Sequence, residues 1–191
     1  MLLSLDVGFA KTGWSVFDGG QPVACGITQQ PKSAKKSVRT ADDNVFRAGL
    51  LATSLKSIIE QYGCKAVIGE LPSGGAQSAS AMRDMAAATC TIAGVVACLG
   101  IPCEWCTPRD VKIAATGLQS GTKEEIMLAV CRRYYWQIDL KTRTNIKGTE
   151  VKSYTFYVLG KKYPGGVFED IADSIAAYWA LSTGNMVKMF G

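Results

Sequence analysis

Short apolar runs alternate along the chain with longer stretches in which apolar residues recur every three to four positions. The short runs, bounded by glycine or proline, are typical of strands, and the longer stretches are typical of helices. We expect five strands, at 2–7, 14–17, 23–28, 65–71 and 102–106. We expect helices at 42–62, 79–99, 108–117, 122–135 and 168–181. This order predicts an α/β fold in which helices flank a mixed five-stranded sheet.

Helix boundaries are marked by residues that satisfy the free backbone groups at helix ends. Asp42-Asp43 is expected to cap the first helix, and Thr107-Pro108 is typical of a helix start. Thr122 and Glu125 have the spacing of a capping box, and Gly184 is expected to close the last helix. These signals support the helix assignments independently of the apolar spacing.

Glycine and proline punctuate the segment 139–168 around the apolar stretch 154–159. We interpret this segment as a hairpin-like insertion in a single domain, since 191 residues fit one globular core. It contains six bases and two acids, and residues 29–40 contain four bases and no acid. Each segment is therefore +4, and the rest of the chain sums to −3, within a total of +5. Two basic segments on a slightly acidic body suit a phosphate backbone, although solvated surface loops have the same charge pattern.

The composition excludes several catalytic classes, because the chain has no histidine. A Ser-His-Asp triad, a Cys-His pair and a histidine general base are ruled out. The histidine-containing zinc motifs of metalloproteases and deaminases are ruled out as well. Any catalysis depends on carboxylates, lysines, cysteines, hydroxyls or a carboxylate-bound metal.

The seven cysteines are an odd number, and the first residues lack the features of a secretory signal. We therefore expect reduced thiols in a cytoplasmic protein. Cys103 and Cys106 have the spacing of half a zinc site, but a second pair of this kind is absent. Small buried apolar cysteines are the favoured interpretation over a structural zinc site.

Residues 86–103 carry no charge over 18 positions, which reaches the length of a membrane span. They are rich in alanine, glycine and threonine, and Gly100-Ile-Pro102 stops a helix. We therefore expect a buried helix that leads into a strand, and no membrane partner.

Four carboxylates occur at positions where an isolated charge is costly. Asp6 and Glu70 end apolar strands, and Asp170 and Asp173 are three residues apart on one face of the last helix. Four carboxylates brought together repel one another, and divalent cations relieve that repulsion. Oxygen ligands without histidine or cysteine favour Mg²⁺ or Mn²⁺, and two such ions can clamp a phosphodiester. Each acid alone is also explained by a salt bridge or a helix cap.

Five sequence blocks resemble a known family. Asp6-Val-Gly-Phe-Ala-Lys-Thr-Gly-Trp resembles the first motif of the RuvC-type Holliday junction resolvases of the RNase H-like superfamily, and Ala66-Val-Ile-Gly-Glu70 resembles the second. The blocks 107–112 and 121–125 resemble its T-P-x-x-V-K and lysine motifs, and Asp170-Ile-Ala-Asp173-Ser-Ile-Ala resembles its closing helix. The similarity runs in order over most of the chain outside 29–40 and 139–168.

The resemblance implies an RNase H-like fold and a homodimeric, Mg²⁺-dependent endonuclease that cuts four-way DNA junctions symmetrically. It implies two Mg²⁺ ions per site, with Mn²⁺ as a substitute, and no organic cofactor. Its implied metal ligands and catalytic acids are Asp6, Glu70, Asp170 and Asp173. Lys123 is implied as a further catalytic residue, and the implied DNA contacts are Lys112, Lys123, Arg109 and Ser73.

Two features depart from the family pattern. Ser73 stands where the family often has an aromatic residue that wedges into the junction, and the insertion is longer than the cellular enzymes need. The insertion suggests a phage or viral member, which would work in the host cytoplasm. Three alternatives stay open: a broader branched-DNA nuclease, an actin-like or YqgF-type phosphate-binding protein, and a non-catalytic DNA-binding protein on the same fold.

Overall fold

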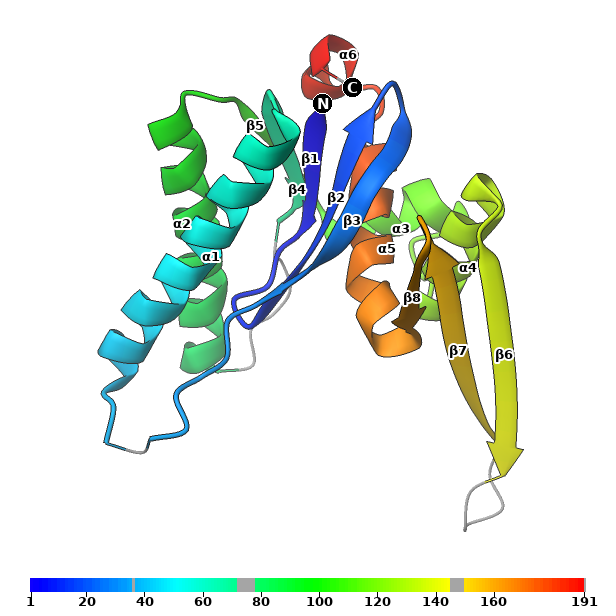
Figure 1. Cartoon of the computed structure of the whole chain (residues 1–191), viewed down its shortest axis with the longest axis horizontal. Coiled ribbons are helices and arrows are strands. Elements are labelled where there is room, and N and C mark those ends of the chain that lie inside the picture. Colours follow the sequence, from blue (N-terminus) through cyan, green and yellow to red (C-terminus); the bar gives the residue numbers. More distant parts are fainter. Residues whose placement is uncertain (36, 72–77, 145–149, 191) are drawn as a thin grey trace.

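The computed structural model describes residues 1–35, 37–71, 78–144 and 150–190 (Figure 1). Five strands form the central sheet: β1 (Leu2–Asp6), β2 (Lys11–Asp18), β3 (Gln21–Gln29), β4 (Ala66–Glu70) and β5 (Cys103–Cys106). Their order is β3-β2-β1-β4-β5, with β1, β4 and β5 parallel to one another and β2 and β3 antiparallel to their neighbours. The predicted mixed five-stranded sheet is confirmed.

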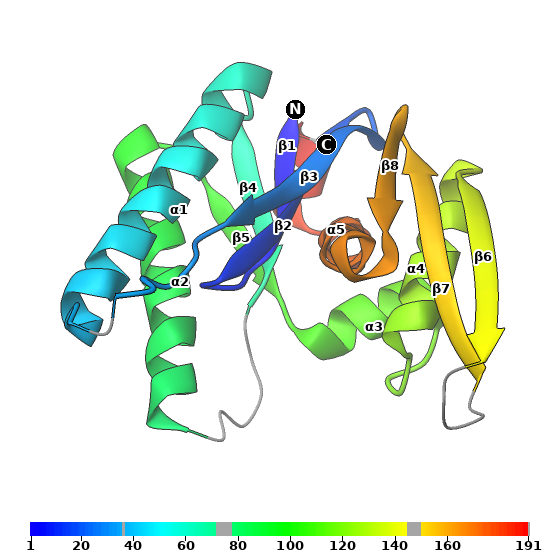
Figure 2. The same cartoon turned by 60° about the horizontal axis from the view of Figure 1, so that its bottom comes forward.

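Helices cover both faces of this sheet (Figure 2). One face carries α1 (Thr40–Tyr62) and α2 (Ala79–Leu99), and the other carries α3 (Pro108–Thr116), α4 (Lys123–Tyr134) and α5 (Gly165–Ala180). Because side chains alternate along a strand, Leu3 and Leu5 of β1 pack toward α1 and α2, whereas Leu2 packs toward α5. The sheet therefore separates two apolar cores.

The predicted helix starts are confirmed at α3 and α4 and differ at α1. In both confirmed cases the threonine hydroxyl accepts from a backbone N–H three residues on, and the acid at that position accepts from the threonine N–H. Helix α1 begins at Thr40, two residues earlier than expected, so that Asp42 and Asp43 lie in its first turn and do not cap it. Acids there still stabilise the helix by interacting with its dipole.

The inserted segment forms a second sheet with strands β6 (Gln137–Thr144), β7 (Glu150–Val158) and β8 (Lys161–Pro164). It is anchored on the main body where Phe156 stacks on Phe168 of α5, with ring centroids 4.3 Å apart. The hairpin prediction missed β8, because its sequence Lys-Lys-Tyr-Pro lacks an apolar run and depends on pairing with β7. The Pro-Gly-Gly sequence predicted as a turn contains the N-cap and first turn of α5, which therefore starts three residues early.

Two further expectations about helices are corrected. Gly184 does not end the helical structure, because α6 (Asn185–Phe190) follows it and Met186 N donates to Glu104. Helix α2 is not a buried helix: its buried residues are Ala88, Ile92 and Val96 alone. By length and composition α2 is apolar enough to cross a membrane, and only 17% of its most apolar window is buried in the chain's own core.

Candidate active site

Asp6 and Glu70 lie side by side at one end of the central sheet. They are the last residues of β1 and β4, and they are direct partners in the parallel register of these two strands. Parallel strands end at the same edge of a sheet, and paired positions face the same side. The prediction that both acids sit at strand ends is therefore confirmed, and their pairing follows from the register.

Helix α5 brings the other two acids to the same end. Ser4 of β1 donates a 2.6 Å hydrogen bond to the Ser174 carbonyl, and the Ser174 hydroxyl donates to Ser15 of β2 at 3.0 Å. Gly13, the partner of Asp6 on β2, lets the helix approach closely, since a Cβ there would lie 2.1 Å from the Asp170 carbonyl oxygen. Small polar residues and one glycine thus fix α5 against the strands that carry the acids.

The four carboxylates are half-buried and repel one another. Burial raises the pKa of Asp6 well above its usual value, and the charges of Asp173, Glu70 and Asp170 raise it further. Burial and Asp173 raise the pKa of Glu70 to about 7. Burial raises the pKa of Asp173 to about 6, and nearby lysines oppose that shift. This end of the sheet therefore favours protons or cations bound to its carboxylates.

Lysines surround these acids from three elements. The charges of Lys123 and Lys112 lower the pKa of Glu70 and of Asp173. Lys123, the first residue of α4, forms an ion pair with Glu169, and that contact raises the pKa of the lysine. Lys11 of β2 forms an ion pair with Asp170.

Sequence reasoning overlooked Lys11 and Glu169. Lys11 occupies a variable position of the first motif, and Glu169 adjoins a motif residue. No spacing rule connects either residue to its distant ion-pair partner. Lys11 also donates to the Gly166 carbonyl at 3.2 Å, which ties the start of β2 to the first turn of α5.

The remaining predicted DNA contacts differ in position. Lys112 is half-buried on α3 beside the acids, as its effect on their pKa values indicates. Arg109 is exposed in the first turn of α3, and it has no ion pair with the four acids in the described part of the chain. Ser73 lies outside the described residues.

The four acids provide the oxygen ligands that a hard divalent cation prefers. All four side chains offer carboxylate oxygens, and Asp170 Oδ2 is buried without a hydrogen-bond partner despite its ion pair with Lys11. Within the described ranges, however, no three acidic, cysteine or histidine side chains form a ready-made ligand cluster. At Asp170 the ammonium of Lys11 lies beside the carboxylate, in the place that a metal ion bound to this acid would take. The Mg²⁺ assignment stays a prediction.

The cysteines take no part in the site. All seven are free thiols. Burial raises the pKa of Cys103 to about 11 and that of Cys106 to about 12, so both side chains are protonated at neutral pH. The expectation of buried cysteines holds for Cys106 but not for Cys90 and Cys98, which are exposed on α2, while Cys103 is half-buried.

Comparison with solved structures identifies the fold. The chain is similar to Thermus thermophilus RuvC in complex with a Holliday junction substrate, with a TM-score of 0.63 and 13% identity over 99% of this chain and 96% of that chain. It is also similar to a second Thermus thermophilus RuvC structure, with a TM-score of 0.61 and 15% identity over 98% of this chain and 95% of that one. No protein-family model and no curated protein sequence matches. The chain therefore has the RNase H-like α/β fold of RuvC, as the five sequence blocks suggested.

Proposed function

We propose that the protein is a structure-selective endonuclease that resolves four-way DNA junctions by metal-dependent hydrolysis of phosphodiester bonds. The observation that carries the proposal is the set of four half-buried, mutually repelling carboxylates at the ends of β1 and β4 and on the facing side of α5, with Lys112 and Lys123 beside them. A merely structural site gains nothing from this repulsion, because each buried charge lowers stability.

Asp6, Glu70, Asp170 and Asp173 would hold two Mg²⁺ ions, with Mn²⁺ as a substitute. Such ions, when bound, supply an activated water and stabilise the leaving oxygen. The chain's own residues position the DNA: Lys112 and Lys123 offer positive charge near the starts of α3 and α4, where backbone N–H groups also attract phosphate. Glu169 orients Lys123 until a phosphate competes for it.

Branched DNA is the substrate class that the charge distribution favours. Both basic segments, the loop before α1 and the ribbon of β6 and β7, extend past the same end of the molecule as the acids, on opposite sides of it (Figure 1). Basic arms on either side of a nuclease site can bind two duplex backbones. The Thermus thermophilus RuvC neighbour was solved with a Holliday junction substrate. Other branched DNA remains within the scope of this proposal.

A homodimer fits this function, because a junction with two-fold symmetry presents equivalent strands to two equivalent sites. Helix α2 is the candidate contact. From Ala86 onward its exposed residues are small and carry no charge, and an apolar groove of about 500 Å³ between α1 and α2 is lined by Cys90, Gly94 and Cys98. Two such faces could approach closely and cover each other. We place the protein in the cytoplasm, or in the host cytoplasm if a phage encodes it.

Cleavage of a labelled four-way junction tests the proposal. We expect Mg²⁺-dependent symmetric nicking, and we expect Asp6→Asn to reduce it at least about a thousand-fold while junction binding is retained. The matched control is Asp18→Asn, which changes an exposed acid at the opposite end of β1 and β2 and should cut normally. A wild-type protein that binds junctions without cutting them in Mg²⁺ or Mn²⁺ would instead support a non-catalytic role.

A further inference from the structure

A polar pocket lies beside the starts of α1 and α2, apart from the four acids. Its volume is about 310 Å³, and it is bounded by the basic loop, the first turns of α1 and the first turns of α2. The side chains that matter to its chemistry are Lys32, Lys35, Asp43, Ser80, Arg83 and Asp84. We refer to it as the α1–α2 pocket.

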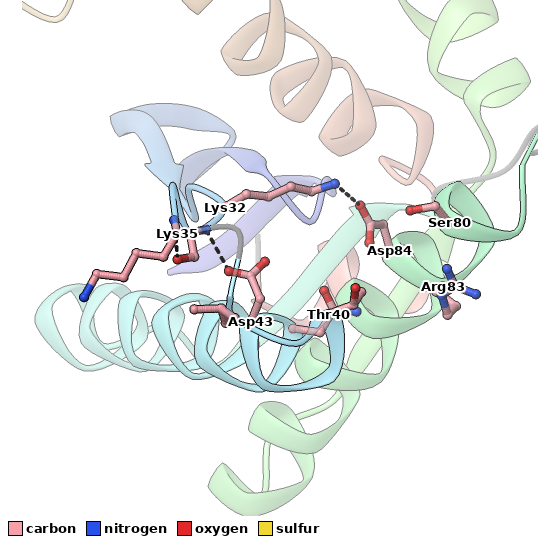
Figure 3. A pocket seen from close by; sticks show the side chains of 10 residues that line it. Lys32, Lys35, Thr40, Asp43, Ser80, Arg83 and Asp84 are labelled. Carbon is pink, nitrogen blue, oxygen red and sulfur yellow. Dashed lines mark hydrogen bonds and ion pairs between the residues drawn. The ribbon is translucent and has the colours of Figure 1, made fainter.

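The bases of the α1–α2 pocket outnumber its acids, and each acid already has a hydrogen-bond or ion-pair partner. Asp43 accepts a 2.7 Å hydrogen bond from the backbone N–H of Ser33. Asp84 lies 4.0 Å from the Lys32 ammonium, which extends across the pocket from the loop toward α2 (Figure 3). Lys35 and Arg83 have no ion-pair partner among the residues described, so their charges are available to a ligand.

A buried arginine behind the pocket adds a further positive charge. Arg47 of α1 is fully buried, and it donates from Nε to the Gln30 carbonyl at 2.9 Å and from Nη2 to the Phe9 carbonyl at 3.2 Å. Its Nη1 is directed at Asp84, at 3.9 Å, and has no hydrogen-bond partner in the described parts of the chain. Arg47 does not line the pocket itself, but its ion pair with Asp84 offsets the negative charge that this acid presents to a ligand.

The two helix starts strengthen the attraction for anions. Helices α1 and α2 are 23 and 21 residues long, and their positive dipole ends both border the pocket. The N-cap of α1, Arg39, makes no side-chain cap hydrogen bond, so the side chain that precedes this helix does not occupy its N–H groups. Phosphate oxygens are suitable acceptors for such groups.

We propose that the α1–α2 pocket is a second phosphate site, which binds the DNA backbone on the opposite face of the sheet from α5. This inference rests on the proposed nuclease function. An extended backbone fits better than one free phosphate, because Lys35 and Arg83 extend away from each other on opposite sides of the pocket (Figure 3). The pocket also lies on the side of the molecule toward which β1 and β4 run, since α1 and α2 begin beyond the ends of these two strands (Figure 1).

The test compares two triple variants with equal loss of charge, both in the Asp6→Asn background so that the junction stays intact. The pocket variant carries Lys32→Gln, Lys35→Gln and Arg83→Gln. The control carries Lys65→Gln, Arg132→Gln and Lys188→Gln, three exposed bases outside both the pocket and the apolar groove between α1 and α2. Junction binding is measured between about 50 and 200 mM salt, the range over which phosphate contacts dominate affinity.

We expect the pocket variant to bind junctions about tenfold more weakly than its parent at low salt. We also expect its salt slope, the change in log affinity with log salt concentration, to become shallower by at least about 1. The control should keep both the affinity and the salt slope of the parent. With Asp6 restored, the pocket variant should cut at the wild-type rate at saturating enzyme. Equal salt slopes in the two triple variants would overturn the inference. A wild-type protein that neither binds nor cuts junctions would instead contradict the proposed function itself.

Inorganic phosphate distinguishes a backbone site from a site for a free anion. We expect millimolar phosphate to raise the melting temperature of the parent more than that of the pocket variant, and junction DNA to abolish this difference by competition. Stabilisation by phosphate that persists in saturating junction DNA would assign the pocket to a free anion and overturn the backbone assignment.

Discussion

Helices α5 and α2 cover opposite faces of one sheet, but only α5 is enclosed. Nine of the 16 residues of α5 are buried, against three of 21 in α2. α5 lies between the main sheet and the inserted sheet, and it carries Asp170 and Asp173. α2 packs on α1 and leaves small apolar side chains exposed. The helix that carries the acids is therefore held in place by contacts within its own chain, whereas α2 has an exposed surface that a second molecule can contact.

The largest expected effect comes from removing the close approach of α5. Gly13→Ala places a Cβ against the Asp170 backbone, which cannot move without shifting the helix. We expect a loss of about 3 kcal/mol in the free energy of unfolding, measured in urea, together with loss of junction cleavage. If Gly13→Ala leaves both stability and cleavage intact, α5 is not held where the structure has it.

The next effect concerns the charge of Glu70 at the end of β4, in metal-free protein. Glu70 has a folded pKa of about 7, above its usual value of 4.5, so its stabilising contribution is present below about pH 4.5 and is lost as the pH rises through about 7. The Glu70→Gln substitution replaces this carboxyl group with an amide, which does not ionise. We expect this variant to be about 2 kcal/mol more stable than wild type at pH 8, with the gain vanishing near pH 5, in urea unfolding with EDTA.

The matched control for this experiment is Glu60→Gln, an exposed acid on α1. It should change stability little at any pH. A gain for Glu70→Gln that does not vary with pH would contradict the assigned cause, since an uncharged contact would then explain it. Added Mg²⁺ should stabilise the wild type more than Glu70→Gln if the acids bind the ion.

For α2 the expected effect is on the association of two copies of the protein into a dimer. Ala97→Glu puts a charge on the exposed face of α2, and we expect sedimentation to show dissociation of the dimer with the monomer still folded. Ala41→Glu, the same change at an exposed site on α1, should leave the dimer intact. A wild-type protein that sediments as a monomer, or an Ala97→Glu dimer, would exclude α2 as the contact.

The smallest expected effect on the free energy of unfolding comes from the second glycine substitution, Gly94→Ala. A Cβ at Gly94 of α2 meets no atom within 4 Å inside the chain. We expect Gly94→Ala to raise the free energy of unfolding by about 0.5–1 kcal/mol, because glycine lowers the stability of a helix interior. A loss as large as that for Gly13→Ala would mean that the two faces of the sheet are equally enclosed.

Local patterns predicted much of this fold and of the site. The capping boxes at Thr107 and Thr122 depend on neighbours three residues away, and the acids at the ends of β1 and β4 stand out because they follow apolar runs. The ion pair of Lys11 with Asp170 joins residues 159 positions apart, and no local pattern indicates it. Apolar spacing also does not reveal whether a helix face is covered by its own chain, which explains the wrong expectation for α2.

The dependence of the site on α5 has a consequence for how the protein is made. A ribosome synthesises Asp6 and Glu70 early, but the helix with Asp170 and Asp173 follows only after residue 164. A growing chain, or one truncated before α5, therefore holds half of the acids. Under the proposed function, cutting competence arises only after α5 has been synthesised, so chains that lack α5 would spare the cell's own DNA.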